Sequence, residues 1–431
     1  MLYLFLLAVS AFCDLQSLYG VGASSTALLG ANKNIPYEAS SSLYNPAMQN
    51  LYDKSQFNLG WIYATDNFDA PKDVVIENEY IGGSNTNNTG DVDTDVDDTN
   101  SLFLSSIFVF EKEGKKKSIG VHLSIPTEKL VGVETQSAYY PQYAMYFADT
   151  QRITLSGAYA WSPMDNLHLG VGFHFFMTTG STIQTTLPAS DNLNPRTSTV
   201  DIKLEVKPSI APIFGLIWNP AESHFIGFNY VGERDAEMVF DANNNVNVLS
   251  SSPIPVNFEG SSSLYYDPEI LSLGYSYQGL NWDFHASVDW ERWSKFSGSS
   301  VVMKFDSDTS FEQFLESSDY DDILTPKVSA MYKSGKNEYI IGLGYRPTPV
   351  PEPEGNLNYL DSDRYMIGIG YGRLLDSTPL LSDNPSKFYI DMQMHSLKDK
   401  DVVKTGNDIG APGYSIGGTT YTIGVSWNIL L

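Results

Sequence analysis

Apolar and polar residues alternate along most of the chain from residue 56 onward. In the segment 282–291, apolar side chains occupy every second position, and polar or charged side chains occupy most positions between them. A period of two is typical of a β-strand with one apolar and one polar face. A soluble sandwich would bury the apolar face, whereas a membrane barrel would turn it to lipid and line its lumen with the polar set. That polar set includes Asp283, His285, Asp289 and Glu291.

The links between the alternating segments differ in length in a regular way. Short links such as SPMDN (162–166) and NPAES (219–223) alternate with long links such as 68–99 and 241–260. Short turns at one end and long loops at the other, with both termini at the short-turn end, are typical of an outer-membrane barrel. The predicted fold is therefore all-β, a transmembrane antiparallel β-barrel of about fourteen strands over residues 56–431.

Tryptophan positions favour the barrel over the soluble sandwich. The indole ring is apolar but carries an N–H, so tryptophan concentrates at membrane–water boundaries. Four tryptophans lie beside predicted short turns or near the end of the last strand, and a soluble sandwich would not require such clustering. We expect them to form an interfacial girdle on the periplasmic side: Trp161, Trp218, Trp282 and Trp427.

Two prolines fall in the predicted strand 197–218. Pro208 and Pro212 have no N–H to give to a ladder, and proline in sheets is found at edges or bulges. We therefore expect the barrel wall to be interrupted there.

Composition narrows the class further. Aromatic residues make up 13% of the chain and charged residues only 18%, so much of the outer surface is expected not to face water. The net charge of -25 argues against a nucleic-acid partner, because phosphate binding needs a basic surface. The acidic runs 91–98 and 319–322 are interpreted as solvated loops. Calcium binding is the alternative for the first run, which lacks the central glycine and closing glutamate of an EF-hand. No metal site or cofactor is expected, because Cys and His show no ligand spacing.

The first residues predict export. An apolar run of about thirteen residues is too short to span a bilayer as a helix and suits a signal peptide. Small residues at Val9-Ser10-Ala11 place the signal peptide at 1–11, with the mature chain beginning at Phe12. The alternative is that Cys13 is a lipidation site, but a phenylalanine directly before the cysteine, Phe12, fits a lipidation signal poorly. As the sole cysteine, it cannot form a disulfide within the chain.

Residues 12–55 contain no alternating run, yet they are apolar. A fourteen-stranded barrel left empty would leak, so we expect this segment to fold into the lumen as a plug, or hatch. The alternative is a flexible periplasmic tail, which such an apolar composition disfavours. The step Asn45-Pro46-Ala47 is predicted to join plug and wall, because Pro46 fixes φ, Ala47 permits close approach and Asn45 can bond the backbone.

Two loop segments are candidates for a binding surface. The long loop 126–150 carries an aromatic cluster where water is expected, and exposed apolar clusters often mark binding sites. The alternative is that this loop packs on its neighbours to close the barrel top. The segment 309–324 is predicted to form an amphipathic helix that serves as a lid or receptor surface. The candidate residues of these two segments are Tyr139, Tyr140, Tyr143, Met145, Tyr146, Phe147, Phe311, Phe314 and Leu315.

The chain resembles the FadL/TodX family of outer-membrane transporters for long-chain fatty acids and other hydrophobic compounds. The resemblance covers nearly the whole mature chain and is carried by the segment ending in Asn-Pro-Ala, by SIPTEKLVG (124–132), by DPEILSLGYSYQGLNWDFHASVDWERWSKFS (267–297) and by GYRPTPVPEPEGNLNYLDSDRYMIGIGYG (344–372). It implies a hatch-blocked barrel in the outer membrane of a bacterial cell, with a periplasmic N-terminus. Fatty acids or aromatic hydrocarbons would be captured at the outer loops, where the two candidate segments 126–150 and 309–324 lie, moved passively past the hatch and released sideways through the wall. The expected partners are this hydrophobic small molecule and outer-membrane lipid, with a monomeric chain.

Two other functions stay open. A general porin or structural barrel would have a wet lumen without a plug. An outer-membrane phospholipase would need a nucleophile, and Ser415 in GYSIG (413–417) matches G-x-S-x-G by letter. That chemistry requires a sharp strand-to-helix elbow, whereas this serine precedes a predicted strand. We therefore expect the protein not to be an enzyme.

Overall fold

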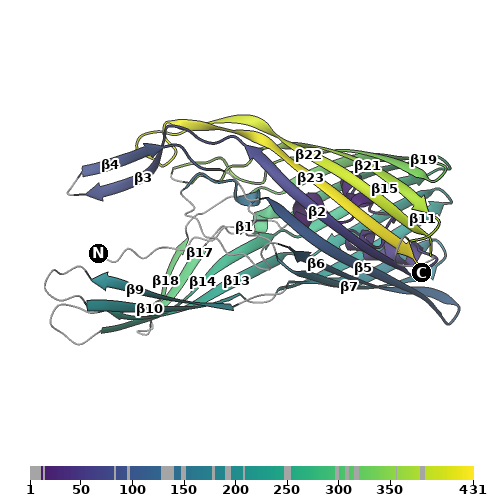
Figure 1. Cartoon of the computed structure of the whole chain (residues 1–431), viewed down its shortest axis with the longest axis horizontal. Coiled ribbons are helices and arrows are strands. Elements are labelled where there is room, and N and C mark those ends of the chain that lie inside the picture. The colour runs from purple at the N-terminus through teal and green to yellow at the C-terminus, as the bar shows by residue number, and fades with distance from the viewer. Residues whose placement is uncertain are drawn as a thin grey trace.

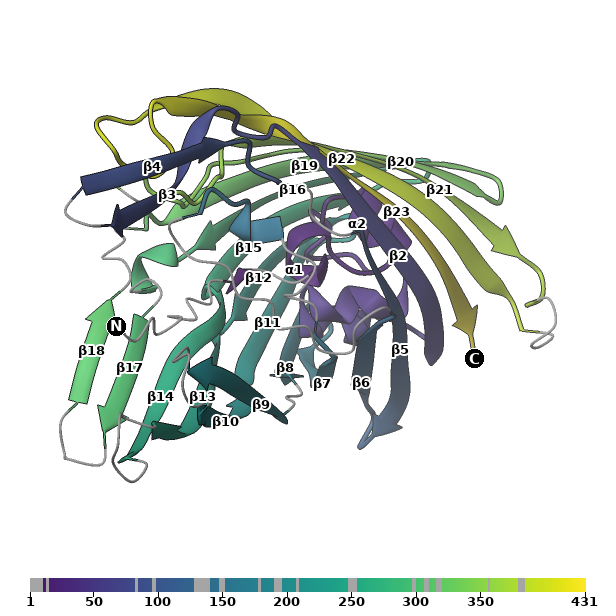
Figure 2. The same cartoon turned by 60° about the vertical axis from the view of Figure 1, so that its left-hand side comes forward.

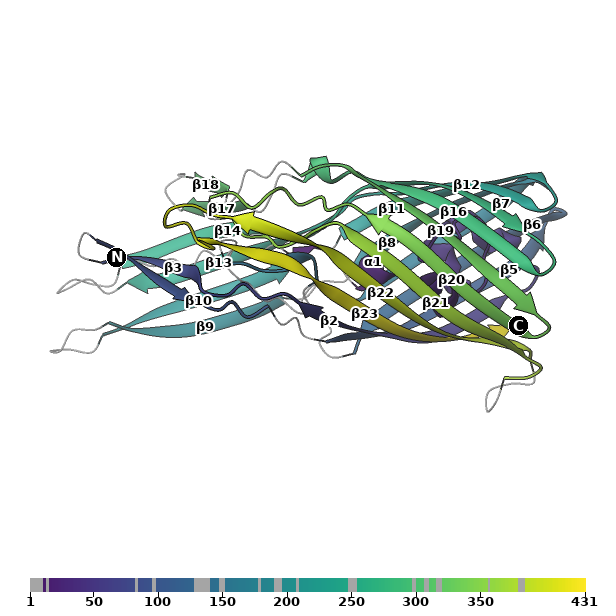
Figure 3. The same cartoon turned by 90° about the horizontal axis from the view of Figure 1, so that it is seen from above.

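The computed structural model describes residues 11–12, 15–81, 84–94, 98–127, 140–146, 152–176, 180–189, 196–206, 209–246, 254–296, 300–305, 310–314, 320–355, 357–378 and 384–431. Within these residues, fourteen antiparallel strands close into one barrel, in which each strand pairs with the next barrel strand along the chain and the last pairs with the first. The predicted fold class is confirmed. Figures 1 and 3 show the barrel from the side and from above, with its strands tilted against the long axis.

The barrel strands follow the chain in order. They are β2 (Gln56–Phe68), β5 (Thr99–Lys112), β6 (Lys115–Pro126), β7 (Thr154–Met164), β8 (Leu167–Phe176), β11 (Ser209–Ala221), β12 (His224–Val231), β15 (Ile270–Gln278), β16 (Trp282–Glu291), β19 (Ile323–Ser334), β20 (Asn337–Arg346), β21 (Arg364–Leu375), β22 (Ser386–Val403) and β23 (Gly413–Leu430). The last of them pairs with β2 from Gln56↔Leu430 to Phe68↔Gly418, which closes the wall.

The outward face of the barrel is apolar, as the alternation predicts. Side chains that point away from the lumen stay exposed although they are apolar, which suits a surface in contact with lipid. Examples are Leu59, Leu102, Ile119, Phe214, Leu273, Phe284, Ile341, Ile369 and Ile423. Among the described residues, no helix is long and apolar enough to cross a membrane.

The four predicted girdle tryptophans all lie near the short-turn end. Trp218 and Trp282 are exposed, with 45% and 46% of their surface accessible. Trp161 and Trp427 are half-buried, and Trp427 donates its indole N–H to Ser386 Oγ at 2.9 Å. This placement agrees with the expected girdle, whose role in the membrane remains a prediction.

Several strands predicted as continuous are divided where the barrel ends and a sheet extension begins. The extension consists of β9 (Gly180–Ala189), β10 (Arg196–Val206), β13 (Arg234–Val246), β14 (Ile254–Asp267), β17 (Ser300–Phe305) and β18 (Ser310–Phe314). It projects beyond the long-loop rim on the left of Figure 1, with the hairpin of β3 (Val74–Ile81) and β4 (Ser84–Gly90) beside the same end. The predicted helix at 309–324 is wrong in its first part: β18 pairs with β17, and its Phe311 and Phe314 are strand residues.

The chain start does not lie at the short-turn end. The short strand β1 (Ala11–Phe12) pairs in parallel with Tyr265 and Tyr266 of β14, next to the long-loop rim. The expectation that both termini share one end is therefore wrong for the start of the described chain. The N-terminal segment runs from this rim down through the barrel and enters β2 at the opposite end.

Residues 15–52, here called the inner segment, occupy the barrel interior. They form α1 (Leu15–Tyr19), α2 (Ala23–Ala27) and the 3₁₀ turns η1 (Ala39–Leu43) and η2 (Pro46–Leu51). Figure 2 shows α1 and α2 enclosed by the wall, and most of the segment is buried. Its apolar residues form a core with inward-facing wall residues such as Ile217, Met331 and Tyr389. A wall of fourteen strands is too wide for its own side chains to fill, and this segment supplies the missing core.

Candidate functional site

The inner segment meets the barrel wall at Asn45-Pro46-Ala47. Asn45 is fully buried and caps η2: its Oδ1 accepts a hydrogen bond from the Ala47 amide at 3.0 Å, and Pro46 occupies the first position of the turn. Its Nδ2 donates to the Lys33 carbonyl at 3.0 Å and to the Phe228 carbonyl on β12 at 3.4 Å. One side chain thus fixes a turn, a second part of the inner segment and the wall.

Glycines face the inner segment where its backbone touches the wall. A Cβ atom added to Gly170 on β8 would lie 2.4 Å from the Ala47 amide nitrogen and 2.5 Å from the Pro46 carbonyl carbon. A Cβ atom on Gly368 of β21 would lie 2.4 Å from the Ala27 carbonyl oxygen. Because these contacts are to backbone atoms, no side-chain rotation could relieve them. The inner segment is fitted to a wall that lacks side chains at these points.

Replacing both Asn45 and Pro46 by alanine is expected to loosen the inner segment. Loss of the cap and of two cross-links from Asn45 would cost about 1–2 kcal/mol, which corresponds to a roughly five- to thirtyfold rise in leakage of small solutes. Swelling of liposomes in a sugar solution measures this leak. Heat-dependent migration on a gel should show that the barrel still assembles. An unchanged leak in an assembled barrel would reduce the motif to a simple turn.

The polar residues predicted to line the lumen do face it. The Tyr37 hydroxyl of the inner segment donates to Asp283 Oδ2 at 2.8 Å and lies 3.0 Å from His285 Nε2. These two wall residues therefore anchor the inner segment. All four predicted residues are buried: Asp283, His285, Asp289 and Glu291.

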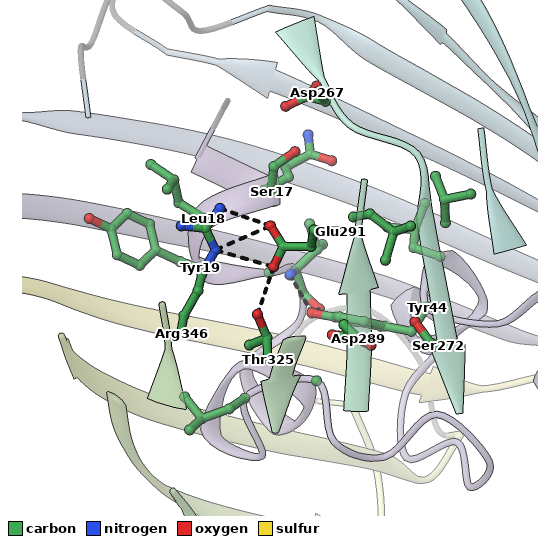
Figure 4. A pocket seen from close by; sticks show the side chains of 18 of the residues that line it. Ser17, Leu18, Tyr19, Tyr44, Asp267, Ser272, Asp289, Glu291, Thr325 and Arg346 are labelled. Carbon is green, nitrogen blue, oxygen red and sulfur yellow. Dashed lines mark hydrogen bonds and ion pairs between the residues drawn. The ribbon is translucent and has the colours of Figure 1, made fainter. Parts of the chain in front are cut away.

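A cavity of about 180 Å³ lies between α1 and the long-loop ends of several wall strands (Figure 4). Sites that enclose a whole drug-sized ligand typically measure roughly 300–1,000 Å³. With the inner segment in this position, the cavity therefore suits one part of a long molecule. Its apolar lining consists of Leu18, Val21, Leu29, Leu43, Val231, Ile270 and Met366.

The cavity is also lined by charged side chains, most of which are paired. Glu291 pairs with Arg346, whose Nη2 lies 2.8 Å from Oε2 (Figure 4). Asp289 lies between Lys33 at 3.3 Å and Lys327 at 2.8 Å. Burial lowers the pKa of Lys33, and the charge of Asp289 opposes that shift. These ion pairs tie the inner segment to the wall beside the cavity.

A third acidic residue anchors the cavity rim. Asp267 at the end of β14 is buried and forms ion pairs with Arg152 and Arg234. The Arg152 and Arg234 guanidinium groups lie over the Phe176 ring, 4.6 Å and 5.5 Å from its centroid. This cluster sits where the barrel strands give way to the sheet extension, so it fixes that junction.

Deeper in the barrel, Glu38 of the inner segment is held by donors from two sides. Its Oε1 accepts from the Ser24 amide at 2.8 Å and the Ser24 hydroxyl at 2.7 Å, and its Oε2 accepts from Asn58 Nδ2 at 3.0 Å and Ser426 Oγ at 2.5 Å. Burial raises the pKa of Glu38, against the opposing effect of these hydrogen bonds. The nearby Asp391 on β22 is also buried, with 3% of the residue exposed.

The aromatic loop predicted to capture substrate is packed down instead. Tyr143, Met145 and Tyr146 are buried, and Tyr140 is half-buried. The Tyr143 ring stacks on Phe68 with centroids 4.2 Å apart, and its hydroxyl bonds the backbone of Gly417 and Asp69. The prediction that these residues form an exposed cluster is therefore wrong, because they pack on their neighbours at the barrel top. Outside the described residues lie Tyr139, Phe147 and Leu315.

Removing the Tyr143 hydroxyl is expected to free this loop. Tyr143→Phe would keep the stack on Phe68 but lose the hydroxyl, which shares its proton between the Asp69 and Gly417 carbonyls at 3.0 Å and accepts from the Gly417 amide at 3.2 Å. The cost is expected to be about 1–2 kcal/mol. Limited proteolysis of the loop should become about tenfold faster or more. Tyr140→Phe is the matched control, and the protease should cut its loop at the wild-type rate. Equal rates in all three proteins would contradict the assignment.

Pro212 is less disruptive than predicted. The ladder between β11 and β8 runs through it without a break, with Pro212 opposite Phe173. On its other side, pairing with β12 ends at Ile213↔Val231, and the Gly232 amide still donates to the Pro212 carbonyl at 2.8 Å. Pro212 therefore lacks its N–H on the side of β12, where the pairing is already ending. The predicted interruption is wrong for the pairing between β11 and β8, which continues through Pro212. Pro208 lies outside the described residues.

Ser415 lies within β23 and not at an elbow. Its hydroxyl donates to Asp401 Oδ1 at 2.7 Å across the β22–β23 pair. A strand position of this kind does not present the strained turn that a nucleophilic serine requires.

Sequence reasoning missed several residues that the structure brings together. Lys33, Glu38 and Gln393 connect the inner segment with the wall, and Gln393 donates to the carbonyls of Tyr19 and Thr26 at 2.8 Å each. The sequence of residues 12–55 does not indicate which side chains of this segment contact which wall residues, because the segment has no periodicity. Arg364, which also lines the cavity, could have been singled out from the sequence, because it lies in the DSDRY step (361–365) that carries part of the family resemblance.

Comparisons with known proteins agree with this architecture. A family model described as outer membrane protein transport protein (OMPP1/FadL/TodX) matches residues 8–421. Alkane uptake protein A of Marinobacter nauticus is 22% identical over 90% of this chain and 85% of its own length.

Solved structures show the same fold at low identity. A Pseudomonas aeruginosa FadL homologue has a TM-score of 0.60 and 15% identity, covering 95% of this chain and 98% of its own. The Pseudomonas putida toluene transporter TodX has a TM-score of 0.54 and 14% identity, covering 95% of this chain and 97% of its own. With a family model that matches nearly the whole chain and this shared architecture, the protein belongs to the OMPP1/FadL/TodX family of outer membrane transport proteins.

Proposed function

We propose that this protein is a passive outer-membrane channel for hydrophobic compounds, such as alkanes, aromatic hydrocarbons or long-chain fatty acids. The observation that carries the proposal is the inner segment, which fills the lumen of a closed barrel and leaves a part-apolar cavity beside α1. A relative named for alkane uptake and structures named for toluene transport support this range of substrates.

The inner segment would act as a plug that moves to let substrate pass. Substrate would arrive at the long-loop end, where the sheet extension and the cavity lie, and would leave toward the other end. In this orientation the long loops face the outside and the short turns face the periplasm, with residues 1–11 removed as an export signal. The chain would work as a monomer embedded in outer-membrane lipid, because one chain closes the barrel.

The test combines two measurements on the purified full chain. Mass spectrometry of the protein extracted in a mild detergent should find a hydrophobic small molecule bound, and planar bilayers should show no large steady current. Large steady currents with no bound compound would identify a general porin. Turnover of a labelled phospholipid would identify an enzyme.

A further inference from the structure

Three lysines gather on one face of the β5–β6 hairpin, at the short-turn end of the barrel. The two turn residues, Glu113 and Gly114, both have positive φ, 59° and 68°, as the type I′ turn of a two-residue hairpin requires. This turn places Lys112 directly opposite Lys115. Lys117 follows Lys115 by two positions and therefore points to the same face of the ladder. These three residues are here called the lysine cluster.

The lysine cluster faces away from the lumen. On β6, Ser118 and Gly120 are buried, whereas Ile119 between them is exposed, so the odd-numbered side of this strand is the outward one. Lys117 lies on that side and is the register partner of Trp161 on β7, one of the four predicted girdle tryptophans. The cluster therefore lies at the level of the barrel where the girdle is expected.

The lysine cluster has no acidic partner on its own face. Other basic side chains at the short-turn end are ion-paired: Lys116 with Asp53, Lys333 with Asp283, Lys336 with Asp376 and Lys387 with Glu338. In the described part of the chain, no carboxylate lies at ion-pair distance from any lysine of the cluster. Of the acids in the hairpin itself, Glu111 is opposite Lys116 on the other face and Glu113 occupies the turn.

This arrangement carries a cost that an external anion would remove. Side chains directly opposite each other on an antiparallel ladder begin only about 5 Å apart, and like charges in such a pair are destabilising. Lys112 and Lys115 form such a pair, and Lys117 adds a third positive charge beside them. An anion bound between these ammonium groups would offset their repulsion, in a chain whose overall charge is -25.

Apolar side chains continue from the lysine cluster along the outside of the wall. Phe108 and Phe110 on β5 and Ile119 and Val121 on β6 are all exposed on this face. Lysines at such a boundary lay their methylene stems on the apolar surface and hold the ammonium group at its edge. A ligand that satisfies both parts has an anionic head and acyl chains that run along the wall. A soluble anion would leave the apolar surface unused, and a second copy of this face would bring like charges together.

We propose that the lysine cluster binds the phosphate head group of an anionic phospholipid, whose acyl chains lie against Phe108, Phe110 and Ile119. The protein would thereby keep a phospholipid of this class beside β5 and β6. This site is independent of the compound that passes through the lumen, so it goes beyond the proposed function. Only the choice of leaflet follows from the orientation proposed above, which places this lipid on the periplasmic side.

Native mass spectrometry of the purified full chain in a mild detergent tests the site. The added probes are phosphatidylglycerol, which has one negative charge, and phosphatidylethanolamine with the same acyl chains, which has no net charge. Each lysine near an anionic lipid surface changes affinity about fivefold, so the wild type is expected to prefer phosphatidylglycerol by roughly ten- to a hundredfold at low salt. This preference should shrink as the salt concentration rises, because exposed charges are screened.

Variants of the cluster separate its charge from the apolar surface beside it. The combined change Lys112→Gln, Lys115→Gln and Lys117→Gln should abolish the preference and leave binding of phosphatidylethanolamine unchanged. Arginine at the same three positions should keep the preference, because it keeps the charge. The matched control removes three lysines near the long-loop end, Lys72→Gln, Lys398→Gln and Lys400→Gln, and should bind both lipids as the wild type does.

Several results would overturn the assignment. One is equal binding of the two lipids by the wild type, and another is an equal loss of preference in the control variant. Displacement of phosphatidylglycerol by glycerol phosphate at equal concentration would mean that the cluster binds a soluble phosphate compound. Wild-type dimers that disappear in the three-glutamine variant would mean that the cluster contacts a second copy of the chain.

Discussion

Replacing Gly170 by valine is expected to open a conducting path through the barrel. The new Cβ would overlap the Ala47 amide and the Pro46 carbonyl carbon, so the inner segment would have to shift at its junction with the wall. Overpacking of this kind typically costs about 1–3 kcal/mol, and backbone contacts place it at the upper end. A loss of stability of that size corresponds to a roughly ten- to hundredfold rise in the fraction of molecules whose inner segment has moved out of its place in the lumen.

Single-channel recordings in planar bilayers measure the effect as a rise in the time spent open. Val171→Leu is the matched control, because it enlarges the next residue on the same strand, which is 37% exposed on the outward face. It should leave conductance unchanged. Wild-type conductance from an assembled Gly170→Val barrel would mean that the inner segment tolerates displacement without opening a path.

The wall could be predicted from sequence because its physics is periodic. Every barrel strand buries one face in the lumen and exposes the other, so a segment such as 282–291 reveals both its strand and its inward set. The prediction failed where periodicity does not decide the structure. The segment 309–324 has a helical spacing of Phe311 and Phe314, yet pairing with β17 makes its first part an edge strand.

The inner segment could be predicted as a plug but not in its contacts. Its apolar composition implied burial, and Asn45-Pro46-Ala47 implied a fixed turn. The cross-links of Glu38 and Lys33 join residues hundreds of positions apart, for example Glu38 with Ser426. Such pairs depend on the register of β2, β16 and β23 around the barrel, which a local pattern does not specify.

The aromatic loop that contains Tyr143 shows a second limit of prediction from sequence. An apolar cluster in a loop predicts either an exposed binding surface or a packed cap, and composition is the same for both. Phe68 at the end of β2 decides between them, because its ring gives Tyr143 a stacking partner. That contact depends on where the loop folds back, which sequence spacing leaves open.

Removing the carboxylate of Glu38 is expected to undock the inner segment. In Glu38→Ala, the Ser24 amide and Asn58 Nδ2 would remain buried without an acceptor, whereas the two serine hydroxyls could rotate. Each buried unsatisfied donor costs about 1–3 kcal/mol, so a total of ~2 kcal/mol or more would raise the leak at least thirtyfold. Ser55→Ala, which alters a half-buried residue outside this network, is the control and should stay closed.

The same residue makes docking depend on pH. The pKa of Glu38 is raised by burial in the docked state and ordinary when the segment is released, so docking takes up a proton. Its contribution is fully present below the ordinary glutamate range and is lost as pH rises through the raised pKa, because burial penalises the ionised carboxylate. Conductance of the wild type should therefore increase with pH. Glu38→Gln should leak more than the wild type in acid, with a flatter pH profile. Parallel pH profiles in the two proteins would show that the Glu38 carboxyl group does not control docking.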